Sequence, residues 1–450
     1  MGYTSKNEFC ERYKKFLDKG VTERKCIGEA GIIAFENGFN TLKERPETFL
    51  KAGDKVIVSH MKKAMALFVI GSEPLENGLN IITSHVDSPR IDVKQATIQE
   101  NKGIAYFDTH YYGGIKKYQW VNTPLAIHGV VYNEELEKIE IDIGSDSDDP
   151  VFVISDLLIH LSSKQMEEKG SHLIDGEKMD VIIGNDYDVS GESGNLKGKI
   201  LSLFKEKYSI KEEDFYSAEL ELVPAGKARD CGMDRNMILA YGQDDRSCVF
   251  SSLKSITELD KPKRTACCIL IDKEEIGSAG ATGMQSRFME NSIAKVMQSC
   301  GAYSEINLRK TLENSCMISA DVTAAYDPMF AEAYAENSSA FLSKGIAISK
   351  YTGARGKNGA NDANAEYVAQ IRKILLDNDI KHQFCEMGKV DQGGGGTVSY
   401  LAAAYGMNVI DAGVPLLGMH APYETSNKDD LYQAYKAYKA FFEKMTQVKY

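Results

Sequence analysis

Two adjacent carboxylates, Glu274 and Glu275, follow an apolar run at residues 266–271 that has the pattern of a buried strand. Side chains alternate along a strand, so neighbouring glutamates at its end point in different directions. One of them can bind a metal while the other performs acid–base chemistry. An isolated pair of this kind is more often a solvated acidic turn, so the rest of the chain has to decide between the two interpretations.

Four further polar stretches come directly after predicted strands. They hold His85 with Asp87, Asp244 with Asp245, Asp321, and His420. In an open α/β sheet, ligands bind outside the carboxyl ends of the strands, so we expect all five stretches to converge on one crevice. Taken singly, Asp244 could be a helix cap and His420 a core histidine. The position that the stretches share favours a common site.

Imidazoles and carboxylates without a cysteine form a donor set typical of zinc, cobalt or manganese. If the carboxylates of Asp244, Glu275 and Asp321 are ligands, they and a bridging hydroxide carry four negative charges, which two divalent cations balance. Asp87, two residues after His85, could hold that imidazole in the ligating tautomer. We therefore predict a two-metal site whose metal-free form is inactive and less stable, because its carboxylates repel one another.

Composition limits the class of protein. The chain has 450 residues, a formal net charge of -12 and nine cysteines without Cys-x-x-Cys spacing. The acidic balance argues against nucleic-acid and anionic-membrane partners, and the odd number of scattered cysteines favours reduced thiols. Residues 1–15 lack the apolar core of a signal peptide, and no run reaches the roughly 18 apolar residues of a membrane span. We expect a soluble cytoplasmic protein.

The elements that must position the site follow two different patterns of predicted secondary structure along the chain. After residue 241, short apolar strands alternate with helices, which predicts a mixed or parallel sheet covered by helices. Residues 92–241 show short alternating segments and few convincing helices, which indicates a β-rich insertion. We therefore predict an α/β catalytic domain from residues 1–91 and 242–450, interrupted by a β-rich domain at 92–241. The predicted helices after the insertion span 246–259, 284–300, 360–377 and 429–445.

Five motifs occur in an order that resembles the aspartyl aminopeptidase family of di-zinc exopeptidases, as a bacterial-type member. They are Thr83–Arg90, Gln243–Arg246, Asp272–Ser278, Ser319–Asp321 and Gly418–Glu424. The match runs from about residue 80 to the end of the chain. The resemblance implies a mixed-sheet catalytic domain, an inserted β-rich oligomerisation domain, two co-catalytic metals, most often zinc, and a tetrahedral dodecamer.

The resemblance also implies roles for individual residues. One metal would be held by His85, Asp244 and Asp321, and the other by Asp244, Glu275 and His420, with Asp244 bridging. Glu274 would be the general base, and Asp87 would orient His85. His160 resembles the histidine that the β-rich domain of this family lends to the active site of a neighbouring subunit; an ordinary helix-face histidine is the alternative.

Two departures from the family pattern bear on substrate preference. Asp245 stands where many relatives have asparagine, and Val322 follows Asp321 where relatives often carry a histidine. Neither change removes a metal ligand, but both weaken the expectation of a preference for acidic N-terminal residues. Lys350 is the candidate to pair with an acidic side chain; Arg355 and Lys357 are alternatives, or all three are solvated loop charges.

A glycine-rich stretch, Gly393–Thr397, precedes a predicted helix. Its free amides, with Gly395 at the centre, could face a substrate carbonyl or carboxylate, and a flexible turn is the alternative.

The functional hypothesis is metal-dependent hydrolysis of the N-terminal residue from peptide substrates by a homo-oligomer. One alternative is another di-metal amidohydrolase of the same structural clan, such as a deacylase or dipeptidase. A second is a non-catalytic peptide-binding shell that retains the fold; the presence of every ligand and of Glu274 argues against it.

Overall fold

A computed structural model describes residues 4–43, 49–186, 196–353 and 355–450. The chain forms two compact units. Unit 1 comprises residues 1–87, 228–419 and 424–450, and unit 2 comprises residues 88–227 together with 420–423. Among the described residues, no helix combines the length and apolar character needed to cross a membrane.

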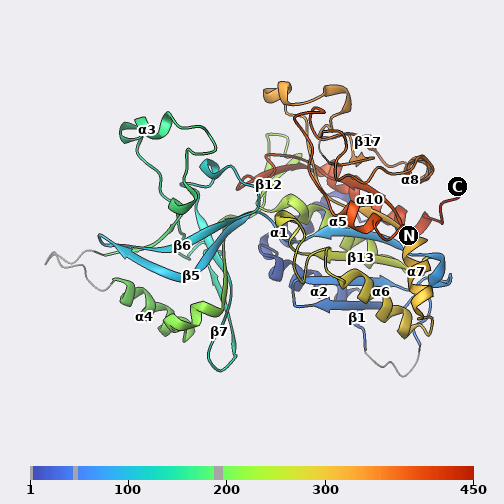
Figure 1. The fold of residues 1–450 in the computed structure, drawn as a ribbon, viewed down its shortest axis with the longest axis horizontal. Helices are drawn as coiled ribbons and strands as arrows, with labels where there is room; N and C mark the ends of the chain where they lie inside the picture. The colour runs from blue at the N-terminus through green and yellow to red at the C-terminus, as the bar shows by residue number, and fades with distance from the viewer. Residues whose placement is uncertain (1–3, 44–48, 187–195, 354) are drawn as a thin grey trace. The chain divides into compact units, whose positions relative to one another are not determined.

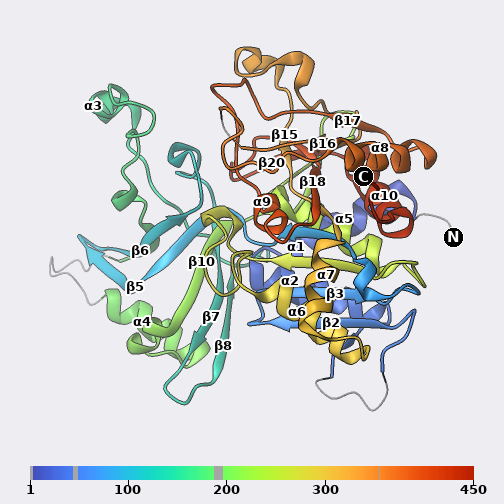
Figure 2. The same cartoon turned by 45° about the vertical axis from the view of Figure 1, so that its right-hand side comes forward.

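Unit 1 is built on a nine-stranded mixed sheet (Figures 1 and 2). Its strands, in spatial order, are β1 (Asn40–Thr41), β2 (Lys55–His60), β3 (Ala64–Val69), β13 (Ala266–Ile271), β4 (Asn80–His85), β14 (Cys316–Ser319), β18 (Asn408–Gly413), β16 (Ile346–Ser349) and β17 (His382–Phe384). The four central strands, β13, β4, β14 and β18, are parallel. Their residues are almost all buried, as expected for parallel strands covered on both faces. The predicted α/β fold with a mixed sheet is confirmed.

Helices cover both faces of this sheet and create two apolar cores. The first core contains residues of α1 (Lys6–Lys19), α2 (Glu23–Glu36), α5 (Gln243–Thr257), α8 (Ala365–Asp377) and α10 (Lys428–Lys444). The second contains residues of α6 (Phe288–Ser299), α7 (Glu305–Glu313) and α9 (Ser399–Ala403). Strand alternation divides neighbours between the cores: Cys268 packs in the first and Cys267 in the second. The side chain of Thr22 caps α2 by accepting the backbone N–H of Lys25.

A second, five-stranded sheet in unit 1 carries the remaining polar stretches. Its order is β11 (Arg229–Cys231), β12 (Met237–Ala240), β20 (Glu424–Asn427), β19 (Pro415–Leu417) and β15 (Thr323–Ala324). Asp244 comes after β12, and His420 comes after β19. His85, the glutamate pair and Asp321 thus follow strands of the nine-stranded sheet, whereas Asp244 and His420 follow strands of this second sheet. Hydrophobic patterning does not specify which sheet a strand joins.

Unit 2 is a six-stranded antiparallel sheet with a helix against it. The strand order is β8 (Lys138–Ile143), β7 (Leu125–Tyr132), β10 (Ala218–Pro224), β5 (Arg90–Asn101), β6 (Ile104–Tyr112) and β9 (Val181–Asn185). Helix α4 (Leu196–Tyr208) lies along this sheet in Figure 2 and packs Phe204 against Phe107. The sequence prediction missed α4, although its buried residues Leu196, Ile200 and Phe204 recur at the four-residue spacing of a helical face. Residues 156–168, which have the most helical pattern of this region in the sequence, form only a 3-10 turn, η3 (Ile159–Leu161), and the single turn α3 (Ser163–Met166).

Unit 2 and the predicted insertion, residues 92–241, have different ends. Residues 228–241 are counted with unit 1 because β12 pairs with β20 through the whole of its length, from Met237 with Asn427 to Ala240 with Glu424.

Candidate metal and active site

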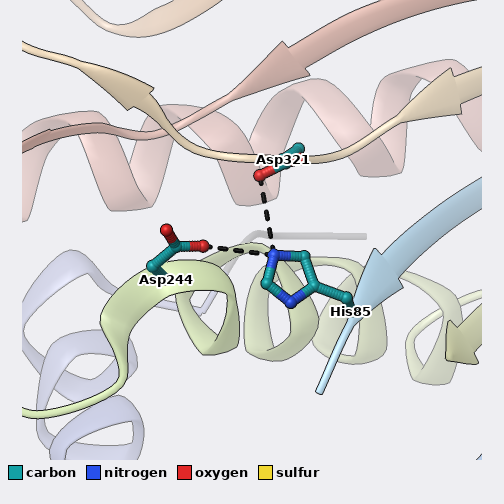
Figure 3. A group of neighbouring side chains, drawn as sticks. All are labelled: His85, Asp244 and Asp321. Atoms are coloured by element: carbon teal, nitrogen blue, oxygen red, sulfur yellow. Dashed lines mark ion pairs between the residues drawn. The ribbon is translucent and has the colours of Figure 1, made fainter. Parts of the chain in front are cut away.

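His85 is the last residue of β4, between the parallel neighbours β13 and β14. Its Nδ1 lies 3.0 Å from the backbone oxygen of Asp87. A carbonyl oxygen only accepts hydrogen bonds, so Nδ1 must carry the proton. The other ring nitrogen, Nε2, lies 3.1 Å from Oδ1 of Asp244 and 3.7 Å from Oδ1 of Asp321. Both dashed lines in Figure 3 run to that nitrogen.

This group has the composition of a metal site. One ligand atom from each of His85, Asp244 and Asp321 lies within 4.8 Å of the others. With Nδ1 protonated, Nε2 carries a second proton if the imidazole is charged and a lone pair if it is neutral. In either case Nε2 faces the carboxylates of Asp244 and Asp321. A lone pair there is repelled unless a cation lies between the three atoms. One imidazole nitrogen and carboxylate oxygens are ligands that zinc accepts, so these residues fit a divalent metal.

Electrostatics in the chain without metal agree with this geometry. Burial alone would lower the pKa of His85, but its hydrogen bonds to Asp244, Asp321 and Asp87 raise that pKa well above its ordinary value. Burial raises the pKa of the Asp321 carboxyl, against the opposing effect of His85. The raised pKa values favour proton binding at this site when no cation is present, and a bound metal would compete with those protons.

Asp87 connects His85 to the glutamate pair. Its carboxylate accepts the backbone N–H of Glu274 at 3.1 Å and that of Glu275 at 3.2 Å, through different oxygens. Its Oδ1 also lies 3.4 Å from Nδ1 of His85. Asp87 is fully buried. The sequence predicts that Asp87 orients His85, and in the structure the side chain of Asp87 also fixes the backbone of both glutamates.

The glutamates lie in a short 3-10 turn, η6 (Glu274–Ile276), between residues in left-handed conformations. Lys273 before the turn has φ 69°, and Gly277 after it has φ 90°. A lysine at positive φ is strained by about 1 kcal/mol or more, and such strain is common at functional sites. Burial, with smaller effects from nearby Asp321 and Asp244, raises the pKa of Glu274 to about 8 in the metal-free chain. A bound cation would oppose this shift.

Asp244 and Asp245, in the first turn of α5, have backbone angles that are not helical. Oδ2 of Asp245 accepts the backbone N–H of His85 at 3.2 Å, and Asp245 is fully buried. Burial raises the pKa of its carboxyl well above the ordinary value. Asp245, noted in the sequence only as a departure from relatives, thus supports the backbone at His85.

His420 lies in the loop after β19 and is counted with unit 2. Its φ is 66°, and its Nδ1 lies 2.7 Å from the carbonyl oxygen of Gly114 in the same unit. As at His85, this contact requires the proton on Nδ1 and leaves Nε2 as the nitrogen able to ligate a metal.

The three predicted substrate-binding residues make the following contacts. The ammonium of Lys350 lies 3.3 Å from Asp362 and follows β16, which runs antiparallel to β18, so Lys350 leaves the sheet at the edge opposite to His85. Gly395 accepts the backbone N–H of Gly353 at 2.8 Å, and the helix after it, α9, has only five residues. His160 lies on η3 of unit 2, within an exposed segment.

Sequence reasoning missed one buried acid beside the site. Glu424 accepts the backbone N–H of Asp244 at 3.0 Å through Oε2, although the two residues are 180 positions apart. Glu424 follows His420 in the last motif. No local sequence pattern predicts its contact with Asp244, because that contact depends on the pairing of β20 with β12.

Comparisons with known proteins give a consistent result. Residues 16–442 match the family model described as aminopeptidase I zinc metalloprotease (M18). A probable M18 family aminopeptidase 1 of Clostridium acetobutylicum is 50% identical over 435 residues, which cover 96% of this chain and 93% of that protein.

Solved structures agree. The crystal structure of an M18 family aminopeptidase from Thermotoga maritima matches with a TM-score of 0.94 and 42% identity, over 98% of this chain and 97% of that one. A structure described as the S. cerevisiae mApe1 dodecamer matches with a TM-score of 0.77 and 20% identity, over 96% of each chain, which is a likeness of fold.

Proposed function

The chain belongs to the aminopeptidase I zinc metalloprotease (M18) family, and from that premise we propose which of its residues hydrolyse the peptide bond. Family membership makes it a metal-dependent aminopeptidase. It favours this activity over the deacylase, dipeptidase and peptide-binding shell that the sequence leaves open. The assignment of individual residues and the substrate preference are proposals.

Two divalent cations, most often zinc, would be held by five residues. His85, Asp244 and Asp321 would hold one cation, and this assignment is supported by the contacts of Nε2 of His85. Asp244, Glu275 and His420 would hold the other, which is supported by their residue types, by the motif order and by the tautomer that Gly114 imposes on His420. When bound, the cations would polarise the scissile carbonyl, anchor the free α-amine and lower the pKa of a water between them.

Glu274 is the proposed general base. Its carboxylate would take the proton of the attacking water and deliver it to the nitrogen of the leaving peptide as the C–N bond breaks. The observation that carries this assignment is the double hydrogen bond from the backbone of Glu274 and Glu275 to Asp87. It fixes both glutamates to the residue that orients His85, so the base and the metal ligands share one rigid support.

The test is Glu274→Gln, which keeps the size of the side chain and removes its basicity. We expect zinc content to stay at the wild-type value while kcat falls by about 10²–10⁴-fold, the usual contribution of a general base. Zinc is measured by elemental analysis of the purified protein, and kcat with aminoacyl chromogenic substrates.

Its neighbour provides the matched control. Glu275→Gln makes the same chemical change one residue away, and we expect it to lose metal together with activity. A Glu274→Gln enzyme that turns over at the wild-type rate would remove Glu274 from the mechanism. N-acyl amino acids in the same assay measure any deacylase activity.

A preference for acidic N-terminal residues rests on sequence alone. Lys350 and Lys357 both pair with Asp362, at 3.3 Å and 2.8 Å. Because the carboxylate of Asp362 partly neutralises both ammonium groups, each attracts an acidic substrate side chain less strongly. A hydrolysis profile across all N-terminal residues decides the preference, repeated with zinc, cobalt and manganese.

We also propose that the chain assembles into a homo-oligomer, as a dodecamer, in the cytoplasm. Support for assembly comes from the exposed apolar side chains around His160 and from the relative described as a dodecamer. In such an assembly, His160 of one subunit would reach the substrate in the site of another. A cytoplasmic location is supported by the nine cysteines, all of which are free thiols.

A further inference from the structure

We propose that Glu424 is a positioning residue that sets the place of the Asp244 carboxylate by holding the backbone amide of Asp244. The inference rests on the proposed role of Asp244 as a ligand of both metals. Glu424 begins β20 and lies opposite Ala240 of β12. Only 2% of its surface is exposed, and its Oε2 accepts the N–H of Asp244 at 3.0 Å.

A second contact fixes the same turn. The side-chain nitrogen of Gln243 donates to the backbone oxygen of Glu424 at 2.6 Å and to that of Ile238 at 3.1 Å. The amide oxygen of Gln243 accepts from the hydroxyls of Tyr13, at 3.2 Å, and Ser426. Three hydrogen bonds therefore tie residues 243–244 to β20: one from the side chain of Gln243 to the backbone of Glu424, one from Ser426 to Gln243, and one from the amide of Asp244 to Glu424.

The start of α5 explains why this support is needed. The first amides of a helix have no partner within the helix, and a side-chain oxygen from elsewhere commonly satisfies them. Gly242 has φ 68°, and Asp244 and Asp245 depart from helical angles, so the helix does not fix the direction of the Asp244 side chain. The carboxylate of Glu424 supplies the fixed point instead.

A carboxylate in this place has an electrostatic cost. It adds a buried negative charge close to Asp244, which is itself close to Asp321 and His85. An amide side chain would accept the same hydrogen bond without the charge. The choice of glutamate is consistent with a cationic centre nearby, because a cation offsets the cost of burying several carboxylates in one region.

The experiment compares Glu424→Ala, which removes the acceptor, with Glu424→Gln, which keeps an acceptor oxygen. Metal-free proteins are titrated with Co²⁺, and binding is followed by the visible absorption of bound cobalt. We expect Glu424→Ala to weaken both cobalt-binding steps by about 10–100-fold, the usual effect of losing a group that orients a metal ligand. Glu424→Gln should recover most of that loss.

A second readout needs no metal. Hydrogen exchange of the peptide that contains Asp244 is measured in the metal-free proteins, and we expect faster exchange in Glu424→Ala than in wild type or Glu424→Gln. Tyr367→Phe is the matched control, because it removes a buried hydrogen bond, to the backbone oxygen of Met317, that does not involve residues 243–244 or 424. It should lower stability without changing either cobalt step.

The outcomes separate this inference from the proposed function. If Glu424→Ala frees the amide of Asp244 but both cobalt steps keep their affinity, Glu424 has only a structural role and the inference is overturned. Weakening of one step alone also overturns it, because Asp244 would then not serve both metals through this contact. If Asp321→Asn leaves both steps unchanged, the ligand assignment itself fails, whatever Glu424→Ala does.

Discussion

The carboxylate of Asp87 shows how one side chain can hold two parts of a site that are distant in the chain. It accepts hydrogen bonds from the backbone amides of Glu274 and Glu275, which are 187 and 188 residues away in the sequence. The backbone oxygen of Asp87 accepts a hydrogen bond from Nδ1 of His85. A buried N–H left without an acceptor costs about 1–3 kcal/mol, so both glutamate amides depend on this residue. Asp87 is therefore as important for the position of Glu274 as for the tautomer of His85.

Asp87→Asn replaces one acceptor oxygen with an amino group that faces a backbone N–H. We expect the free energy of unfolding of the metal-free protein to fall by about 2–3 kcal/mol, since a buried donor loses its partner. We also expect kcat to fall at least tenfold because the backbone of Glu274 moves. Urea denaturation and steady-state kinetics measure the two effects.

Asp430→Asn is the control for Asp87→Asn. Asp430 is also fully buried and accepts two backbone amides, from Ser343 and Gly345 at 2.7 Å each. Its variant should lose similar stability and keep the kcat of the wild type. Equal kcat in both variants would show that the contacts of Asp87 serve stability alone.

At the scale of elements, Glu258 joins the end of α5 to other parts of unit 1. It pairs with Lys439 at 2.7 Å and Lys254 at 2.9 Å, and it accepts the hydroxyls of Tyr435 and Thr4. Burial alone would raise the pKa of Glu258, but these partners lower it to about 2. Asp244, the proposed ligand, lies in the first turn of α5, so this contact secures the far end of the same helix.

The sign of this shift predicts a pH-dependent stability. A carboxyl with a lowered pKa in the folded state stabilises the fold above its unfolded pKa, near 4.5, and loses that effect as the pH falls toward 2. We expect Glu258→Gln to lower the free energy of unfolding by about 2 kcal/mol at pH 7. Urea denaturation from pH 7 to pH 3 should show the difference between wild type and variant shrinking below about pH 4.5.

Glu305→Gln makes the same change in an exposed pair with Arg309 on α7. Exposed pairs contribute about 0–1 kcal/mol, so this control should show little difference at any pH. A Glu258→Gln difference that stays constant between pH 7 and pH 3 would show that packing, and not the charge of Glu258, stabilises this contact.

At the scale of the whole molecule, unit 2 presents apolar side chains that a single chain does not cover. Exposed fractions are 59% for Leu158, 64% for Ile159 and 71% for Leu161, on both sides of His160. Scattered exposed apolar residues are normal, but a contiguous group is typical of an interaction surface. This surface supports the proposed assembly, and it would bring His160 to a neighbouring subunit.

Assembly and catalysis can be separated by two variants. Ile159→Asp with Leu161→Asp should reduce the assembled mass measured by light scattering after size exclusion, because buried charges oppose association. His160→Ala should leave that mass unchanged and lower kcat/KM. Leu136→Asp, at an isolated exposed leucine of unit 2, is the control for surface charge and should change neither. Full assembly of the double aspartate variant would exclude this surface from the interface.

The sequence determined the chemistry and the fold class, because both are encoded locally. The types and order of His85, Asp244, Glu275, Asp321 and His420 predicted the metal chemistry, and hydrophobic periodicity predicted the strands that precede them. The family comparisons confirm the metalloaminopeptidase function and the α/β fold. The roles of the individual residues stay predictions until the variants above are measured.

Only the tertiary structure decided which residues support the ligands. Asp87 reaches the amides of Glu274 and Glu275, and Glu424 reaches that of Asp244, across separations of 180 residues or more. The structure also divided the five polar stretches between two sheets and placed Lys350 at the edge away from His85. The physical reason is the same in each case. Hydrophobic periodicity shows which residues form a strand, but the neighbour and direction of that strand come from pairing between distant segments, which no local pattern records.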